Sequence, residues 1–190
     1  GWAACFLDFE NDGDLDIYHT NGWPFSDDFN DFSFDTSRAF VNDGSGRFTE
    51  HADGYGIADT EQGRGVVCAD FDDDGDVDIL LLHRARNNAV TLWRNDHDDN
   101  NYLSVSLRGL PPNTEASGAR VHVEIGGTVQ MREISIGSNF VSHNPTRQVF
   151  GLGTSAQVDR LRVEWPDGSH SDLTNVAAGQ LLVIDHPDRP

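Results

Sequence analysis

The sequence contains no lysine, and all 13 of its basic residues are arginine. Against them stand 32 acidic residues, so the formal net charge is −19 at pH 7. The surplus lies in the first half: residues 1–99 hold 23 Asp and Glu against 6 Arg, whereas residues 100–190 hold 9 against 7. Such a surface repels nucleic-acid phosphates and anionic lipid headgroups, so cations are the natural partners of the first half.

Long apolar runs and amphipathic helices are also missing. No stretch approaches the roughly 18–20 apolar residues that span a bilayer, so we expect no transmembrane helix and no membrane insertion. Gly1 stands in the middle of an expected strand with no leader before it, so we expect a fragment or a processed product. Hydrophobic residues make up 37% of the 190 residues, which is enough for one large or two small domains with real cores.

Only two cysteines are present, Cys5 and Cys68, and each stands shortly before an acidic segment. In an exported protein the two could pair. The alternative is two buried thiols that pack as small apolar side chains. Two cysteines do not make a disulfide framework, so the sequence favours the thiols and leaves the pairing open.

An internal repeat with an offset of 62 residues is visible. Residues 4–17, ACFLDFENDGDLDI, align with residues 66–79, VVCADFDDDGDVDI, and residues 40–43 are echoed by residues 93–96. Each unit reads as a strand, an acidic loop and a second strand, which is typical of propeller blades or solenoid repeats. We place the two repeats at about 1–61 and 62–99.

Strand patterns continue through the rest of the chain, and the expected fold class is all-β. Residues 79–82 form a short buried strand, and residues 39–50 form a hairpin around the glycine-containing loop 42–46. Residues 22–35 show no clean period and are expected to be a long loop. Beyond residue 100 apolar and polar residues alternate, with a two-residue Gly126-Gly127 hairpin, so residues 100–190 are predicted to form a small β-sandwich or barrel-like domain.

The two acidic loops, Asp8–Asp16 and Asp70–Asp78, share one pattern. Acidic residues occupy positions 1, 3, 5, 7 and 9 of each nonamer, and glycine occupies position 6. The candidate metal ligands are therefore Asp8, Glu10, Asp12, Asp14 and Asp16 in the first loop and Asp70, Asp72, Asp74, Asp76 and Asp78 in the second.

Calcium fits this pattern because it is a hard cation that takes six to eight oxygen ligands, which a tight loop with glycine at its sharp turn can supply. Positions 1, 3 and 5 would bind through side chains, position 7 through its backbone carbonyl, and position 9 would complete the shell. Zinc is disfavoured because neither nonamer contains Cys or His. The sequence therefore predicts two bound calcium ions.

Charge repulsion supports a cation in each loop. Two carboxylates about 4 Å apart repel by on the order of 4 kcal/mol at an effective dielectric of about 20, so folding of the first half should be linked to calcium. The loops are not EF-hands, because position 12 is His19 or Leu81 and not a bidentate glutamate. A solvated acidic turn is the alternative, disfavoured because the pattern occurs twice, and Glu10 is the departure that weakens the first site.

Residues 64–79 and the matching loop in residues 4–17 resemble FG-GAP/VCBS repeats, the calcium-loop blades of integrin-type β-propellers. The second half resembles the ASPIC/UnbV domain, and the combined order resembles the C-terminal part of cartilage-acidic-protein-like proteins. The second match rests on Gly118–Val121, Arg132–Ile134, Gly137-Ser138, Phe150–Gly153 and Val163–Gly168.

This resemblance implies a secreted or cell-surface, calcium-binding adhesion or structural module. It carries over no catalytic residue, and the sequence offers none: the eight histidines form no metal-binding pair and no serine lies in a nucleophile elbow. The expected function is therefore non-enzymatic. A propeller-based carbohydrate-active or lyase-type enzyme is the alternative, which perturbed His, Arg and carboxylate residues in a pocket away from the loops would favour.

Partners follow from what the two repeats leave open. Family propellers close with more blades than this chain holds, and two blades alone leave open sheet edges. We therefore expect either further blades, or a protein partner or second copy that pairs with the edges, which would make a self-assembling, filament-forming subunit. A glycan-binding module is a third possibility and predicts exposed aromatic faces near Trp23.

Overall fold

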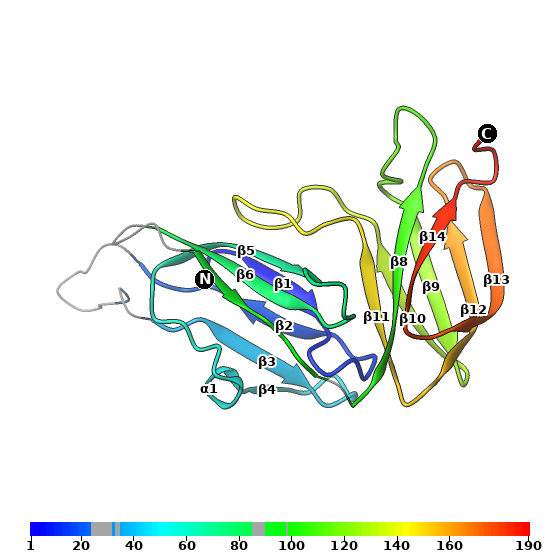
Figure 1. Ribbon diagram of the computed structural model, residues 1–190. Coiled ribbons are helices and arrows are strands. Elements are labelled where there is room, and N and C mark those ends of the chain that lie inside the picture. Colours follow the sequence, from blue (N-terminus) through cyan, green and yellow to red (C-terminus); the bar gives the residue numbers. More distant parts are fainter. Residues whose placement is uncertain (24–31, 33–34, 85–89, 98) are drawn as a thin grey trace.

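The computed structural model describes residues 1–23, 32, 35–84, 90–97 and 99–190, and these residues are almost all in strands or short connections (Figure 1). Most of the predicted loop 22–35 lies outside the described residues. Within the described part, no helix is long and apolar enough to cross a bilayer. The elements are β1 (Ala4–Leu7), β2 (Asp16–His19), β3 (Arg38–Asn42), β4 (Phe48–Glu50), α1 (Ala52–Tyr55), β5 (Gly63–Ala69), β6 (Asp78–His83), β7 (Val90–Trp93), β8 (Asn101–Arg108), β9 (Arg120–Ile125), β10 (Thr128–Glu133), β11 (Gln148–Gly153), β12 (Gln157–Glu164), β13 (His170–Ala177) and β14 (Gln180–Asp185).

Strands β1 to β4 form one antiparallel sheet in chain order, which we call the first blade. The hairpin predicted for residues 39–50 is confirmed, with β3 and β4 joined through residues 43–47. Side chains in β1 alternate as a half-buried strand requires: Cys5 and Leu7 are buried, whereas Phe6 is exposed. The buried side chains all lie on one face, so the sheet has an inner and an outer surface.

Strands β5, β6 and β7 form the second blade, an antiparallel sheet in chain order. Its inner face, which includes Val66, Ile79 and Leu81, shares one apolar core with Leu7 and Tyr18 of the first blade. The two repeats therefore pack face to face. The strand expected over residues 79–82 is confirmed as part of β6, but it is half-buried and not fully buried: Ile79 and Leu81 face the core, whereas Leu82 is exposed.

A disulfide bond between Cys5 and Cys68 joins the two blades, so the expectation of two free thiols was wrong. Spacing along the chain gave no hint of this, since the cysteines are 63 residues apart. The packing of β1 beside β5 brings them together, with their Cα atoms 6.6 Å apart, inside the range that a disulfide spans.

Strands β8 to β14 form a sandwich of two sheets, which confirms the prediction for the second half. One sheet has the order β10-β9-β12-β13, and the other has the order β11-β8-β14, with β14 parallel to β8 (Figure 1). A separate core lies between the sheets, and β9 and β10 meet at the predicted Gly126-Gly127 turn, where both glycines have positive φ. The core includes Leu103, Val105, Val121, Val123, Phe150, Leu161 and Val163.

The segment 135–147 between β10 and β11, which we call the arm, reaches from the sandwich to β5 (Figure 1). Asn139 Nδ2 donates to the Val66 carbonyl at 2.8 Å, and Ser142 Oγ bonds both the N–H and the carbonyl of Val66, at 3.1 and 2.9 Å. Asn144 Oδ1 accepts from Cys68 N–H at 2.9 Å. The edge of β5, expected to be open, is therefore covered by side chains of the arm.

Candidate metal centres

The two acidic loops have the same backbone conformation. Position 4 is left-handed in both, with φ of 55° at Asn11 and 64° at Asp73. Position 6 has φ of 100° at Gly13 and 98° at Gly75, a region that favours glycine. The repeated sequence thus folds into a repeated loop, which supports the interpretation of the nonamers as one kind of site.

The first carboxylate of each loop anchors the turn. In the first loop (residues 8–16), Asp8 accepts hydrogen bonds from the backbone N–H groups of Asp12 and Gly13, at 3.1 and 2.9 Å. In the second loop (residues 70–78), Asp70 Oδ2 accepts from Gly75 N–H at 3.2 Å. The chain therefore wraps around the position 1 carboxylate, which points into the loop.

The last carboxylate of the first loop ties it to the neighbouring strand. Asp16 accepts from the N–H groups of Phe9 and Asn42, both at 2.8 Å. The residue after position 1 and the final residue of β3 are thus held by the same side chain. This arrangement gives position 9 a structural role besides the ligand role expected for it.

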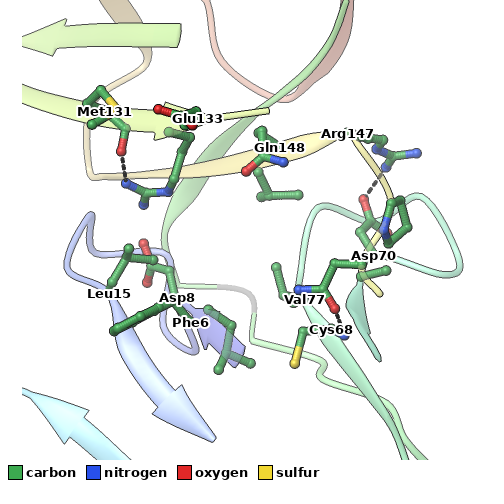
Figure 2. Close-up of a pocket in the computed structure, with 16 residues that line it drawn as sticks. Phe6, Asp8, Leu15, Cys68, Asp70, Val77, Met131, Glu133, Arg147 and Gln148 are labelled. Carbon is green, nitrogen blue, oxygen red and sulfur yellow. Dashed lines mark hydrogen bonds and ion pairs between the residues drawn. The ribbon is translucent and has the colours of Figure 1, made fainter. Parts of the chain in front are cut away.

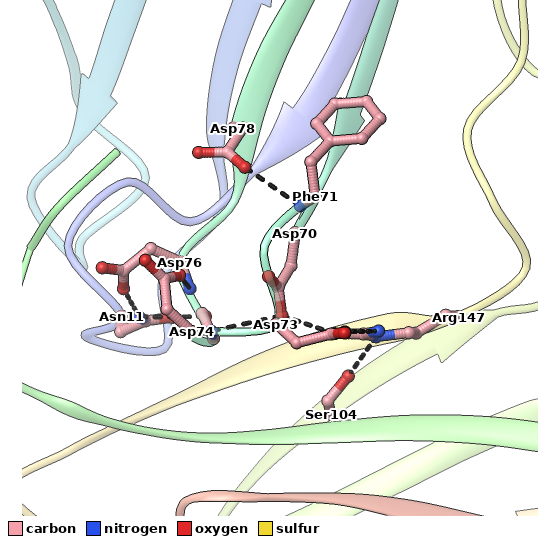
Figure 3. Close-up of polar contacts among 10 residues, drawn as sticks. Asn11, Asp70, Phe71, Asp73, Asp74, Asp76, Asp78, Ser104 and Arg147 are labelled. Carbon is pink, nitrogen blue, oxygen red and sulfur yellow. Dashed lines mark hydrogen bonds and ion pairs between the residues drawn. The ribbon is translucent and has the colours of Figure 1, made fainter. Parts of the chain in front are cut away.

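The second loop repeats these bonds. Asp78 accepts from Phe71 N–H at 3.0 Å (Figure 3). It also accepts from Asn95 N–H at 2.8 Å. Asn42 and Asn95 occupy equivalent places in the repeat of residues 40–43 and 93–96. The repeated segment is therefore the one whose backbone N–H donates to the position 9 carboxylate of each loop.

The structure gathers some of the ten predicted ligands more closely than others. Oxygen atoms of Asp8, Glu10 and Asp16 lie within 4.8 Å of one another in the first loop, and the same holds for the trio at positions 1, 3 and 5 of the second. That second trio is Asp70, Asp72 and Asp74. Glu10, the departure from the pattern, is therefore part of its cluster. Asp12, Asp14, Asp76 and Asp78 belong to neither group.

All four residues make other contacts, those of Asp78 being the bonds to Phe71 and Asn95. Asp12 accepts from Asp14 N–H at 2.9 Å, and Asp76 accepts from Asn11 Nδ2 at 2.6 Å. Asn11 Nδ2 also lies 3.3 Å from the Gly75 carbonyl, so the side chain of the first loop bonds directly to the second. The two candidate sites are thus neighbours and not independent loops.

Burial and mutual repulsion disfavour the charged form of these carboxylates. Burial is the main cause that raises the pKa of Asp8 and of Asp16 from 3.8 to about 7, and that of Asp76 to about 6. Neighbouring carboxylates add to the effect, Asp12 at Asp8 and Asp74 at Asp76. A bound cation would remove this conflict by supplying the missing positive charge.

One oxygen in the second loop has no partner among the described residues. The side chain of Asp70 is 1% exposed, and its Oδ1 atom is buried without a hydrogen bond. A buried carboxylate oxygen without a donor is costly, and a hard cation is a natural partner for it. The donor set is all oxygen in both loops, so the residues present fit calcium.

Both loops lie against the sandwich. A side chain at Gly151 of β11 would meet Asp8 Oδ2 at 2.2 Å, and one at Gly75 would meet the ring of Tyr102 in β8 at 2.1 Å. Glycine at each point lets loop and strand approach closely. Gly153 N–H also donates to the Asn11 carbonyl at 2.9 Å. The candidate centres therefore sit at the junction of blades and sandwich, which the loop sequences alone do not reveal.

A pocket of about 410 Å³ opens at this junction (Figure 2). Asp8 and Asp70 reach it from the two loops, and Arg132 and Arg147 reach it from the sandwich. An enzyme would be favoured by carboxylates with shifted pKa values in a pocket away from the loops. In this pocket the carboxylate with a shifted pKa is Asp8, which belongs to a loop.

A third group with metal-binding atoms is Asp167, His186 and Asp188, in the sandwich. Each nitrogen of the buried His186 ring already has a partner: Nε2 lies 3.1 Å from both Asp167 Oδ2 and Ser169 Oγ, and Nδ1 accepts from Asp188 N–H at 3.2 Å. The cluster fastens the end of β14 to the turn 166–168.

Sequence reasoning missed the side chains of the arm, including Arg147 at its end. Arg147 contacts Asp70 and Asp73 of the second loop, although it is more than 70 residues away in sequence. A single arginine carries no periodicity or spacing signal. The sequence held one hint that the sandwich contacts a loop. Gly151, in the Phe150–Gly153 motif, has no side chain where β11 approaches the first loop.

Comparison with known proteins gives two family matches. Residues 26–81 match the FG-GAP-like repeat, and residues 109–190 match the family described as ASPIC and UnbV. Cartilage acidic protein 1 from Homo sapiens is 30% identical over 185 residues, which cover 92% of this chain. The chain spans 26% of the length of that relative. The resemblance drawn from the motifs is confirmed, and together the matches point to an extracellular chain of repeat and structural domains.

Proposed function

We propose that this chain, in which an FG-GAP-like repeat precedes an ASPIC and UnbV domain, is a calcium-binding extracellular structural or adhesion module. Each nonamer would hold one calcium ion, and the ions would fix both loops against each other and against the sandwich. Calcium is then part of the architecture and not a catalytic cofactor.

The observation that carries this proposal is the buried, unpartnered Oδ1 atom of Asp70 beside Asp72 and Asp74. A loop made only to be a solvated turn would turn its carboxylates to water, where charge is stabilised. Here the first carboxylate points inward, and its Oδ1 atom lacks a donor. The raised pKa values of Asp8 and Asp16 in the other loop support the same conclusion, since the carboxylates need a cation to stay charged at neutral pH.

A non-enzymatic role is the better supported of the alternatives. The carboxylates of the 410 Å³ pocket already have partners: Asp8 accepts from its own loop and Asp70 pairs with Arg147. The third, Glu133, pairs with Arg120. An enzyme would need titratable groups free to meet a substrate. A glycan-binding role keeps one observation in its favour, since Trp23 and Phe32 are 44% and 50% exposed, as that alternative predicts. Trp23 also stacks on Trp2, with ring centroids 5.6 Å apart.

The partner we propose is a protein surface, or a second copy of this chain, that adds to the free side of the second blade. Strand β7 is the last strand of its sheet, and Val90 and Leu92 on it are 60% and 54% exposed. Exposed apolar side chains on an edge strand favour pairing with another strand. With calcium bound, such pairing between copies would build filaments, which light scattering of the purified chain tests.

Calcium binding is tested by calorimetric titration of the chelator-treated protein and by melting with and without calcium. We expect two sites and a rise in melting temperature. Glu10→Ala and Asp72→Ala should each reduce the stoichiometry to one, whereas Asp53→Ala, outside the loops, should keep two sites. Absence of heat and of any melting shift would refute the proposal.

A further inference from the structure

We infer that Arg147, supplied by the sandwich, is the positioning residue of the cation site in the second loop, and that cation binding there is coupled to docking of the sandwich. This inference rests on the proposed calcium binding. It adds that a candidate ligand of the second loop is held by a side chain bonded to the sandwich. In the first loop, the described side chain that bonds a candidate carboxylate from outside is Tyr55, which lies in α1 and contacts Glu10.

The guanidinium of Arg147 links the two parts of the molecule through three separate nitrogens (Figure 3). Nε donates to Ser104 Oγ of β8 at 2.7 Å, which fixes the guanidinium plane to the sandwich. The two terminal nitrogens donate to Asp73 and to Asp70 Oδ2. A planar guanidinium that is hydrogen-bonded through Nε has little rotational freedom, so it fixes the orientation of the carboxylates that it contacts.

The contact divides the two oxygens of Asp70 between different tasks. Oδ2 accepts from both Gly75 N–H and Arg147, and so is directed toward the loop backbone and the sandwich. Oδ1 is buried and has no donor. The carboxylate is thus held with one oxygen occupied and the other bare, and the bare oxygen is available to a cation alongside Asp72 and Asp74. Hydrogen bonding of this kind to a ligand carboxylate commonly sets metal affinity.

The first loop provides an internal comparison. Asp8 uses one oxygen for Asp12 N–H and the other for Gly13 N–H, so its orientation is set within the loop. No ion pair joins Asp8 to an arginine among the described residues. Burial raises the pKa of Asp8, and the longer-range charge of Arg132 offsets only part of that rise. Removal of Arg147 should therefore affect the second loop and spare the first.

The second loop makes few other contacts with the sandwich that could couple the two. Gly75 packs on Tyr102, which is a steric contact that no charge controls. Arg147 is the described residue that pairs with a candidate ligand on one side and with a sandwich strand on the other. Since coupling between sites is reciprocal, a cation that tightens Asp70 must also tighten the docking of the sandwich.

The test is calcium calorimetry in two single-site backgrounds, Glu10→Ala, which leaves the second loop, and Asp72→Ala, which leaves the first. Adding Arg147→Gln to the first background should weaken calcium binding by about tenfold to 100-fold. In the second background it should change binding by less than about twofold. Arg147→Lys should restore part of the affinity, because it keeps one charged donor. Arg160→Gln, which removes an ion pair with Asp172 on the sandwich surface, is the control and should change neither site.

Three outcomes are informative. Unchanged or tighter binding at the second loop in Arg147→Gln would overturn the inference, and tighter binding would mean that the guanidinium competes with the ion. Equal weakening of both loops would also overturn it, since it would show a general structural effect. If neither single-site background binds calcium before Arg147 is changed, the proposed function itself fails, which distinguishes the two.

Hydrogen exchange supplies a readout of the coupling that does not depend on affinity. Calcium should slow exchange of backbone amides in β8 and in the arm of the otherwise unaltered chain, and this protection should be lost in Arg147→Gln. Should Arg147→Gln fold poorly, Ser104→Ala removes only the anchor of the guanidinium and should weaken the second site in the same direction by a smaller factor. Equal protection in all variants would contradict the coupling.

Discussion

The stability of the ion-free protein should fall as pH rises from about 4 to about 7, opposite to the usual behaviour of acidic groups that form ion pairs. The reason is the buried carboxylate of Asp8, whose pKa is raised from 3.8 to about 7. Between these values the folded protein holds a proton that the unfolded chain has released. Its stabilising contribution is fully present below the unfolded pKa and is lost as pH rises through the folded pKa.

The magnitude follows from the shift. A rise from 3.8 to about 7 corresponds to about 4 kcal/mol, because one pKa unit is about 1.4 kcal/mol. Asp16, raised to about 7 by burial, acts in the same direction. Their sum is less than twice the single value, since the two carboxylates are close and titrate together. Calcium should reverse the trend, because bound carboxylates are charged and protons compete with the ion.

The assay is urea unfolding of chelator-treated protein at several pH values between 4.5 and 8, repeated with calcium. Asp8→Asn should reduce the ion-free pH dependence without abolishing it, since the substituted amide does not titrate whereas Asp16 still does. Asp172→Asn, at a surface carboxylate whose pKa is lowered by Arg160, is the control and should leave the slope intact. An ion-free protein that gains stability between pH 5 and 7 would refute the reasoning.

Further predictions concern the contacts that hold the parts together. Cys5→Ser opens a disulfide that spans 63 residues and should lower the free energy of unfolding by about 4 kcal/mol, measured by urea unfolding; no change on reduction of the unaltered protein would contradict this. Gly75→Ala drives a Cβ into a ring of β8 at positive φ and should cost about 2–5 kcal/mol, whereas Gly126→Ala, with open space around it, should cost about 1 kcal/mol; equal costs would exclude the steric explanation. Ser142→Ala leaves Val66 N–H on the β5 edge without its partner and should cost about 1–2 kcal/mol, and a neutral result would show that the arm does not cover that edge.

The local structure of the loops was predictable because it is encoded within nine residues. Gly13 and Gly75 stand where the backbone needs positive φ, and the alternating carboxylates mark the loops as sites for a hard cation. The all-β class, the hairpin at Gly126-Gly127 and the presence of a strand near residues 79–82 were equally accessible, since a period of two and turn residues are short-range signals.

The assembly of these pieces was not predictable in the same way. The bond between Cys5 and Cys68 depends on β1 lying beside β5, and the cover over the β5 edge depends on where the arm lands. Both contacts join residues more than 60 positions apart, and no periodic pattern specifies which distant partner a side chain meets. Repeat logic predicted the blades but could not predict what would cover their edges.

The sequence by itself thus determined that this protein has two acidic loops of one shared pattern, a strand-based first half and a sandwich after it. Only the tertiary structure decided that the loops touch each other, that they lie on the sandwich, and that Arg147 holds Asp70. The physical reason is that a loop conformation depends on φ, ψ and neighbouring carboxylates, whereas the burial and charge balance of a site depend on every segment that packs around it.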